Sequence, residues 1–250
     1  MSKNELSILD KFIKNNVKET IIENYENRAI IRTLIQLIPY GGVMDTYLTT
    51  TFNNILIERS RNFFDELNSG NFILTEEIID SEDFLHSYFS TYKAAIYTRQ
   101  KSKIRFFARL LINGVILNDL SIINEYEDYL KILEDLTYRE IYILYTLYKF
   151  ENKYCSDILG ADRAYIKQMN SNKYWNDFIT KITKDLNIEV DEIFGLIHRL
   201  SRTGCYREFS GFSFSQNDGS GYTTHVFDKL VKLIAMERED LSDINNIKII

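Results

Sequence analysis

The chain has 250 residues, of which 45% are hydrophobic and 26% charged, and its formal net charge is −6. This composition is typical of a folded globular protein with one large domain or two medium ones, and it excludes disorder as the main state. The acidic balance also argues against a general nucleic-acid binder, because neutralisation of phosphates supplies most of the non-specific affinity.

The cysteine count and the N-terminus indicate the cellular compartment. Two isolated cysteines, Cys155 and Cys205, make neither a disulfide framework nor a zinc site, and we expect both to be small buried apolar side chains. The N-terminus lacks the apolar run of a signal peptide, and no apolar stretch approaches the ~20 residues that span a bilayer. These features predict a cytoplasmic protein with no membrane span.

The N-terminal part predicts helices over 5–15, 17–38 and 43–68. Pro39-Tyr-Gly-Gly42 separates the second from the third, because proline blocks continuation of a helix and the glycines allow a sharp turn. Gly70 is predicted to end the third helix in a left-handed conformation. Polar residues within the apolar helices around the turn favour a packed hairpin over one that inserts into a membrane.

Ser81 is a predicted N-cap, since two carboxylates follow it in the first turn of a helix. The apolar spacing from Phe84 to Val115 predicts one long helix, with Gly114 as an end or a kink. A shorter helix is expected over 124–134.

A run of basic side chains occupies the middle of that long helix: Arg99, Lys101, Lys103, Arg105 and Arg109. Helical spacing would place Lys101, Arg105 and Arg109 on one stripe, because residues four apart are neighbours on a helix. The stripe is a candidate surface for an anion, for nucleic acid or for an acidic partner. The favoured alternative is a solvated face whose charges pair with the acidic cluster at 76–83.

The second half of the chain predicts the layout of a winged helix-turn-helix. Thr137 and Glu140 form a predicted capping box at the start of a helix. Two short, closely connected helices follow at 175–186 and 190–203, and Gly204 ends the second. The wing and its flanks are expected to be a strand at 205–214, a turn at 216–221, a return strand at 222–223 and a helix at 225–237.

The predicted fold is therefore mainly α. Residues 1–134 would form a helical bundle domain, and 135–240 a winged helix-turn-helix domain with a small β-wing. The tail at 241–250 has no firm assignment, although Ile244–Ile250 would suit a strand.

The charge of the presumed recognition helix at 190–203 indicates which class of partner the winged helix-turn-helix would bind. Such a helix reads base edges with residues near its N-terminus, and here Glu189, Asp191 and Glu192 occupy that end and would repel phosphates. The positive charge lies toward the wing, at His198, Arg199, Arg202 and Arg207. Nucleic acid is therefore disfavoured as a partner, and a protein-docking or structural role is expected instead.

Known catalytic signatures are missing from the sequence. Histidine occurs only at His86, His198 and His225, and Asp83 with His86 makes half of a bundle di-metal site. The chain has no phosphate-binding P-loop, no dinucleotide glycine motif and no nucleophile elbow. We therefore predict no catalytic residue, no metal and no cofactor, while a dispersed active site stays open.

Three helical segments and the winged-helix passage carry a resemblance to a known family. The segments are Ser-Glu-Asp-Phe at 81–84, Arg-Phe-Phe-Ala-Arg-Leu-Leu-Ile-Asn at 105–113, and the stretch from Tyr126 to Leu144. Across about 75–235 the chain resembles the bacterial family called abortive infection alpha. The resemblance implies antiphage defence or a mobile-element setting, and it supplies no catalytic residues.

The leading hypothesis is a non-enzymatic protein of this kind that works through protein contacts or self-association, with the winged helix as docking module. The first alternative is a DNA-binding transcriptional regulator that uses Arg199, Arg202 and the wing. The second is an effector enzyme or a membrane-acting toxin, for which the turn at 39–42 would be the first place to look.

Overall fold

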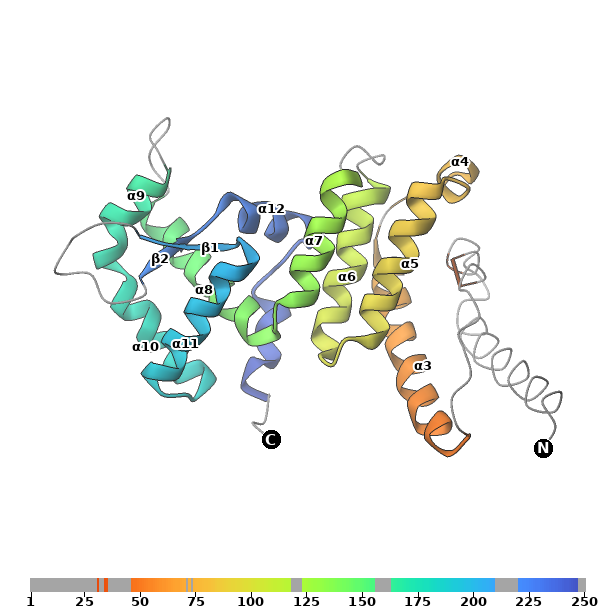
Figure 1. Ribbon diagram of the computed structural model, residues 1–250, viewed down its shortest axis with the longest axis horizontal. Helices are drawn as coiled ribbons and strands as arrows, with labels where there is room; N and C mark the ends of the chain where they lie inside the picture. The colour runs from red at the N-terminus through yellow and green to blue at the C-terminus, as the bar shows by residue number, and fades with distance from the viewer. Residues whose placement is uncertain are drawn as a thin grey trace. The chain divides into compact units, whose positions relative to one another are not determined.

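A computed structural model describes residues 46–70, 72, 74–117, 123–155, 163–209 and 220–246, together with Ile31, Leu34 and Ile35. This part of the chain is mainly helical and contains a small two-stranded antiparallel sheet, as the sequence predicts (Figure 1). The chain divides into two compact units, residues 1–130 and 131–250. The division falls within helix α7 (Ile123–Asp135), and the sequence placed it after residue 134. The predicted helix at 5–15 and the turn at 39–42 lie outside the described residues.

Unit 1 is built on α3 (Thr46–Ser69), α5 (Glu82–Tyr97) and α6 (Ile104–Leu111), which pack against one another (Figure 1). The short helix α4 (Glu76–Ile79) precedes α5, and a π-helical turn, η3 (Ile112–Ile116), continues α6. The turn includes Gly114, where the sequence predicted an end or a kink.

Aromatic side chains fill the core between these helices. Phe63 and Phe64 of α3 are fully buried, and the Phe63 ring meets Tyr92 of α5 edge-on with 5.6 Å between ring centroids. The Tyr92 hydroxyl lies 2.7 Å from the Ser60 hydroxyl, and the Tyr88 hydroxyl donates to the Leu34 carbonyl at 2.6 Å. Each buried phenol thus has a hydrogen-bond partner, as burial of a polar group requires.

The prediction of one long helix from Phe84 to Val115 is wrong. Helix α5 ends at Tyr97, because Thr98 adopts an extended conformation with φ −63° and ψ 136°. A 3₁₀ turn, η2 (Lys101–Lys103), then leads into α6, which packs back against α5. The apolar faces of both helices pack into the same core. The apolar residues therefore recur at helical spacing on both sides of the break, as they would in one continuous helix. The break itself contains neither glycine nor proline, and the sequence therefore gave no sign of it.

The predicted helix cap at Ser81 is confirmed, since its hydroxyl accepts a hydrogen bond from the Phe84 backbone N–H at 3.2 Å. The left-handed conformation predicted for Gly70 is wrong. A Cβ atom at Gly70 would come within 2.9 Å of the end of the Ile112 side chain, which would have to shift to admit it.

Unit 2 is organised around α8 (Tyr138–Tyr154). Helices α10 (Trp175–Leu186) and α11 (Val190–Leu200) pack against α8 and against each other. The remaining helical elements are α9 (Arg163–Asn170), α12 (His225–Leu233) and the 3₁₀ segments η4 (Ser171–Lys173), η5 (Ser201–Thr203) and η6 (Glu239–Asn246). The described part of η6, Glu239–Asn246, is 3₁₀ helix where a strand was expected from residue 244.

Strands β1 (Tyr206–Glu208) and β2 (Gly221–Thr223) pair antiparallel, with Tyr206 opposite Thr223 and Glu208 opposite Gly221. Strand β2 also packs on α8. The residues between Phe209 and Ser220 lie outside the described part of the chain, and they include most of the predicted wing.

Local signals placed the helix ends of unit 2 well. The capping box of Thr137 and Glu140 is confirmed in both directions, and α10 has the predicted bounds. Gly204 follows η5 with a φ of 71°, a left-handed conformation that glycine adopts without steric cost.

Candidate functional site

Arg199 and Arg202, two residues of the candidate interaction or nucleic-acid surface, converge on one buried carboxylate, Glu140 of α8. Arg202 donates from Nη1 to Oε1 at 2.8 Å and from Nη2 to Oε2 at 3.2 Å. Arg199 Nη2 lies 3.6 Å from the same Oε1. The Glu140 side chain has 0% exposure, and this forked ion pair joins α8 to η5, the 3₁₀ turn that follows α11.

Arg202 also binds two backbone carbonyls. Its Nη2 donates to Asp135 O at 2.8 Å, and its Nη1 donates to Arg199 O at 2.7 Å. Burial by itself raises the pKa of Glu140, but hydrogen bonds from Arg202 and Thr137 outweigh burial and hold that pKa below its ordinary value. The carboxylate is therefore ionised, and Arg202 is committed to its own chain.

The other sequence-predicted residues of unit 2 stand apart from Glu140. His198 Nδ1 lies 2.7 Å from Glu208 Oε1, so α11 is tied to β1 by exposed side chains. Arg207 is exposed on β1, opposite Tyr222, and within the described ranges it forms no ion pair. Arg207 is thus the cation of this group that is most available to an external anion.

The first turn of α11 is exposed and acidic, with Glu189, Asp191 and Glu192 all at the surface. Arg139 approaches Glu192 at 3.8 Å. Val190, between the carboxylates, is 42% exposed although it is apolar. This end of the helix therefore offers negative charge around an apolar side chain.

The basic stripe of unit 1 is divided between two elements, because Lys101 lies in η2 while Arg105 and Arg109 lie in α6. The four-residue spacing that predicted one face therefore does not apply to Lys101. Lys101 Nζ pairs with Glu58 at 2.6 Å, and Arg109 Nε pairs with Glu66 at 2.5 Å. The partner carboxylates belong to α3, whereas the sequence pointed to the cluster at 76–83.

Arg105, the third cation of the stripe, and Arg99, from the wider run of basic residues, have different surroundings. Arg105 is half-buried, with Nε donating to Ser102 O at 3.2 Å and the guanidinium 5.9 Å from the centroid of the Phe106 ring. Arg99 is exposed in the break between α5 and η2. The stripe is thus largely a set of internal ion pairs and backbone contacts.

A second buried charge pair, which the sequence did not suggest, joins α8, α9 and β2. Lys167 Nζ lies 2.7 Å from Glu151 Oε2 and donates to the Thr223 carbonyl at 2.6 Å. The Thr223 N–H donates to Glu151 Oε1 at 2.9 Å, and the Thr223 hydroxyl donates to Oε2. Burial raises the pKa of Glu151, while Lys167 and Thr223 oppose that rise. All three residues are buried, so the network ties α8, α9 and β2 together inside unit 2.

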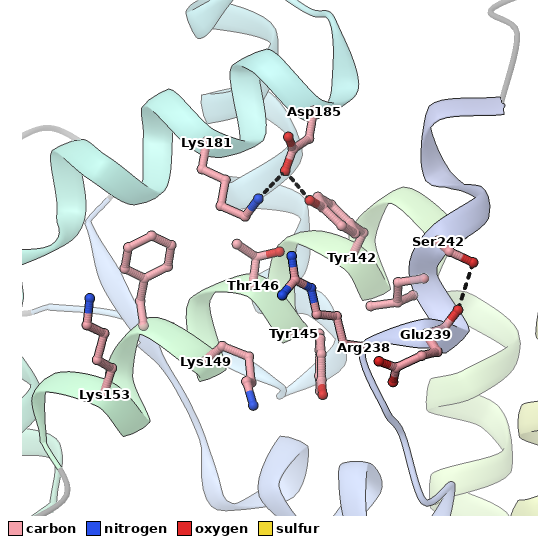
Figure 2. Close-up of a pocket in the computed structure, with 12 residues that line it drawn as sticks. Tyr142, Tyr145, Thr146, Lys149, Lys153, Lys181, Asp185, Arg238, Glu239 and Ser242 are labelled. Carbon is pink, nitrogen blue, oxygen red and sulfur yellow. Dashed lines mark hydrogen bonds and ion pairs between the residues drawn. The ribbon is translucent and has the colours of Figure 1, made fainter.

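A pocket of about 960 Å³ opens in unit 2 between α8, α10 and the segment 238–242 (Figure 2). Its charged lining consists of Lys149, Lys153, Lys181, Arg238, Asp185 and Glu239. The sequence carried one local signal for it, since Lys149 and Lys153 lie four residues apart on one helix. Arg238 comes from a distant segment, and no spacing rule connects it with α8.

Asp185 accepts hydrogen bonds from two other side chains that line the pocket. Figure 2 shows the Lys181 ammonium and the Tyr142 hydroxyl converging on its carboxylate; Lys181 Nζ lies 2.6 Å from Oδ2, and the Tyr142 hydroxyl donates to the same oxygen. Burial alone would raise the pKa of Asp185, but these two hydrogen bonds lower it below its ordinary value. Burial and the neighbouring Asp185 together raise the pKa of Tyr142.

Two of the pocket's cations have no anionic partner among the described residues. In the part of the chain that the structure describes, neither Lys149 nor Arg238 forms an ion pair, and both are exposed to solvent. The Lys153 ammonium lies 5.1 Å from the centroid of the Tyr154 ring. Positive charge in the pocket is therefore only partly neutralised by the chain itself.

Comparison with family models, with curated proteins and with solved structures finds no match to this chain. Among the described helices, none combines the length and the apolar character needed to cross a bilayer. The same residues contain no group of three or more histidine, cysteine or acidic side chains arranged to hold a metal ion.

Proposed function

We propose that unit 2 is a winged helix that docks onto a protein partner, and that the chain works through such contacts rather than by catalysis. Helices α8, α10 and α11 pack on one another before two antiparallel strands and the further helix α12, and this arrangement supports a winged helix in which α9 is an additional helix between α8 and α10. The proposal extends to the setting of antiphage defence, which rests on the resemblance to the abortive infection alpha family.

The observation that carries the docking role is the commitment of Arg202 to Glu140 and to two backbone carbonyls. A guanidinium held in this way has little left to offer a phosphate. The exposed first turn of α11 offers three carboxylates instead, at Glu189, Asp191 and Glu192. Charge complementarity then points to a partner with a basic surface that also covers Val190.

A mobility-shift assay with duplex DNA tests the exclusion of nucleic acid. The full chain should give no shifted band, even at the low-salt end of a titration between about 50 and 200 mM salt. A band that weakens steeply with salt and disappears on Arg207→Glu would overturn the proposal in favour of a DNA-binding regulator.

Site-specific photo-crosslinking tests the protein contact directly. A photoreactive phenylalanine analogue at position 190 should give a discrete covalent adduct in the native cell, and Glu192→Lys should abolish that adduct. Thr180, which is exposed on α10, provides the matched control position. Equal adduct formation at 180 and 190, or no effect of Glu192→Lys, would contradict docking through α11.

A phage-challenge experiment tests the proposed setting. Cells that express the chain should plate phage less efficiently than cells that express the Glu192→Lys variant. Equal plating by the two strains across a panel of phages would remove the defence role while leaving the docking role to be judged by crosslinking.

A further inference from the structure

We propose that the pocket between α8, α10 and the segment 238–242 binds a phosphate-bearing small molecule of nucleotide size. This site is separate from the exposed first turn of α11, and the inference does not rest on the docking role proposed above.

The charge of the pocket is the first argument. Four basic and two acidic side chains line it, so the pocket is net positive in a chain whose net charge is −6. One cation, Lys181, is neutralised by Asp185. Lys149, Lys153 and Arg238 then line the pocket against one remaining carboxylate, Glu239, and an anion bound among the cations would relieve their mutual repulsion.

The type of cation is the second argument. Arg238 presents a planar fork of donors that matches two oxygens of one phosphate, and the lysines act as point charges at variable reach. Figure 2 shows Arg238 extending from its own segment toward the side of the pocket that holds Asp185 and Tyr142. Its charge is near enough to oppose the rise in the pKa of Tyr142. A guanidinium on one wall and lysines on another can grip a chain of phosphates from two sides.

Size and lining are the third argument. A volume of about 960 Å³ lies at the upper end of the range of small-molecule sites, roughly 300–1,000 Å³, and exceeds what a lone phosphate fills. Tyr145 and Phe150 supply aromatic surface for a flat ring, while Glu239 and Thr146 supply acceptors for hydroxyl groups. A nucleotide combines an anionic end, a hydroxylated sugar and a flat base in one molecule of this size.

Fluorescence anisotropy of a ribose-labelled adenosine triphosphate with the full chain tests the proposal. Binding should saturate, weaken with salt, and be displaced by unlabelled nucleotide and by pyrophosphate. Arg238→Glu and Lys149→Glu should each weaken binding about tenfold or more, as expected for loss of a charge-assisted hydrogen bond. Lys232→Glu, an exposed change on α12 outside the pocket, is the matched control and should bind as the wild type does.

Three results would overturn the proposal: no saturable binding, an equal loss of binding in Lys232→Glu, or displacement by a neutral nucleoside as effective as by the nucleotide. Better displacement by an oligonucleotide than by the mononucleotide would also overturn it, in favour of a nucleic-acid site. Circular dichroism and the thermal midpoint of each variant separate loss of the site from loss of the fold. Crosslinking at position 190 should be unchanged in Arg238→Glu, so the failure of one proposal can be told from the failure of the other.

Discussion

Glu140 has two roles that usually fall to different residues. It closes the capping box at the start of α8, with Thr137 N–H donating to its Oε2 at 2.8 Å, and it accepts hydrogen bonds from Arg202 of η5. A carboxylate without these donors would be costly at full burial, because desolvation penalises the charged form. The hydrogen bonds outweigh that penalty, and the pKa of Glu140 is lowered as a result.

Replacement of Glu140 should therefore destabilise unit 2. Glu140→Ala removes the partner of Arg202 and the cap of α8 together, and we expect the free energy of unfolding to fall by about 2 kcal/mol or more. Urea titration followed by tryptophan fluorescence measures the change, since Trp175 is the single tryptophan and belongs to unit 2. Glu189→Gln, at an exposed carboxylate that makes no side-chain cap for α11, is the control and should change stability by only a few tenths of a kcal/mol. Equal effects of the two changes would contradict this account.

The same residue sets a pH dependence whose sign follows from the lowered pKa. A group with a depressed folded-state pKa stabilises the fold above its ordinary value, 4.5 for this carboxyl, and loses that contribution as pH falls through the folded-state pKa. The stability gap between the wild type and Glu140→Gln should thus be full near neutral pH and narrow in the acid range below 4.5. Urea titrations at a series of pH values measure it, and a gap that widens on acidification would contradict the assignment.

At the scale of elements, the Glu151–Lys167–Thr223 network joins two helices and a strand. The Lys167 side chain of α9 is buried in unit 2. Its ammonium forms an ion pair with Glu151 and donates a hydrogen bond to the Thr223 carbonyl. Removal of one charge from a buried pair leaves the other unpaired, which costs more than the intact pair contributes. The network therefore specifies how α9 and β2 sit on α8 more than it adds net stability.

Single and double replacements in this network should therefore differ in their effect on the free energy of unfolding. Lys167→Met should lower the free energy of unfolding by about 3–5 kcal/mol, because it strands the Glu151 carboxylate in the core. The double change Lys167→Met with Glu151→Gln should recover part of the loss, because no buried charge is then left unpaired. Urea titrations of both single variants, the double variant and the wild type complete the cycle. Additive losses in the double variant would show that the two side chains are not coupled.

Two glycines of unit 2 should respond in opposite ways to alanine. A Cβ at Gly221 would collide with the Arg207 carbonyl and the Tyr206 ring, whereas a Cβ at Gly195 meets nothing within 4 Å. Gly221→Ala should cost roughly 1–3 kcal/mol through overpacking of the β1–β2 pair. Gly195→Ala, in the interior of α11, should add up to about 1 kcal/mol through helix propensity. Thermal midpoints of the two variants, measured side by side, should move in opposite directions.

The sequence predicted what local chemistry determines. Ser81 and the pair Thr137 and Glu140 were identified as helix caps because a cap is defined by residues three apart. The break after Tyr97 was not predicted, because both flanking helices bury one face and the break has no turn-forming residue. The ion-pair partners of Arg202 and Lys167 were not predicted either. Glu140 and Glu151 lie 62 and 16 positions away along the chain, and no spacing rule connects residues at such separations.

At the scale of the whole molecule, each unit encloses its own aromatic core. Phe107 is 1% exposed in unit 1, and Trp175 is 3% exposed in unit 2. Units with separate cores can in principle fold separately. The single tryptophan then reports on unit 2 alone, whereas far-ultraviolet circular dichroism reports on the helices of both.

Phe107→Ala tests whether the two units unfold separately. The cavity should destabilise unit 1 by about 3–5 kcal/mol. The helical signal should therefore lose part of its amplitude at lower urea, while the midpoint of Trp175 fluorescence stays at its wild-type value. A common shift of both signals would show that the chain unfolds as one cooperative unit.

Helix α8 carries two fully buried carboxylates, Glu140 and Glu151, and it also lines the pocket through Lys149 and Lys153. These positions would drift at different rates during evolution. A change at 140 or 151 should be less costly when Arg202 or Lys167 changes with it, whereas changes at 149 and 153 should be limited by the ligand proposed for the pocket. Diverged relatives of this chain would then be recognised by correlated replacements at 140 with 202 and at 151 with 167, rather than by any one invariant residue.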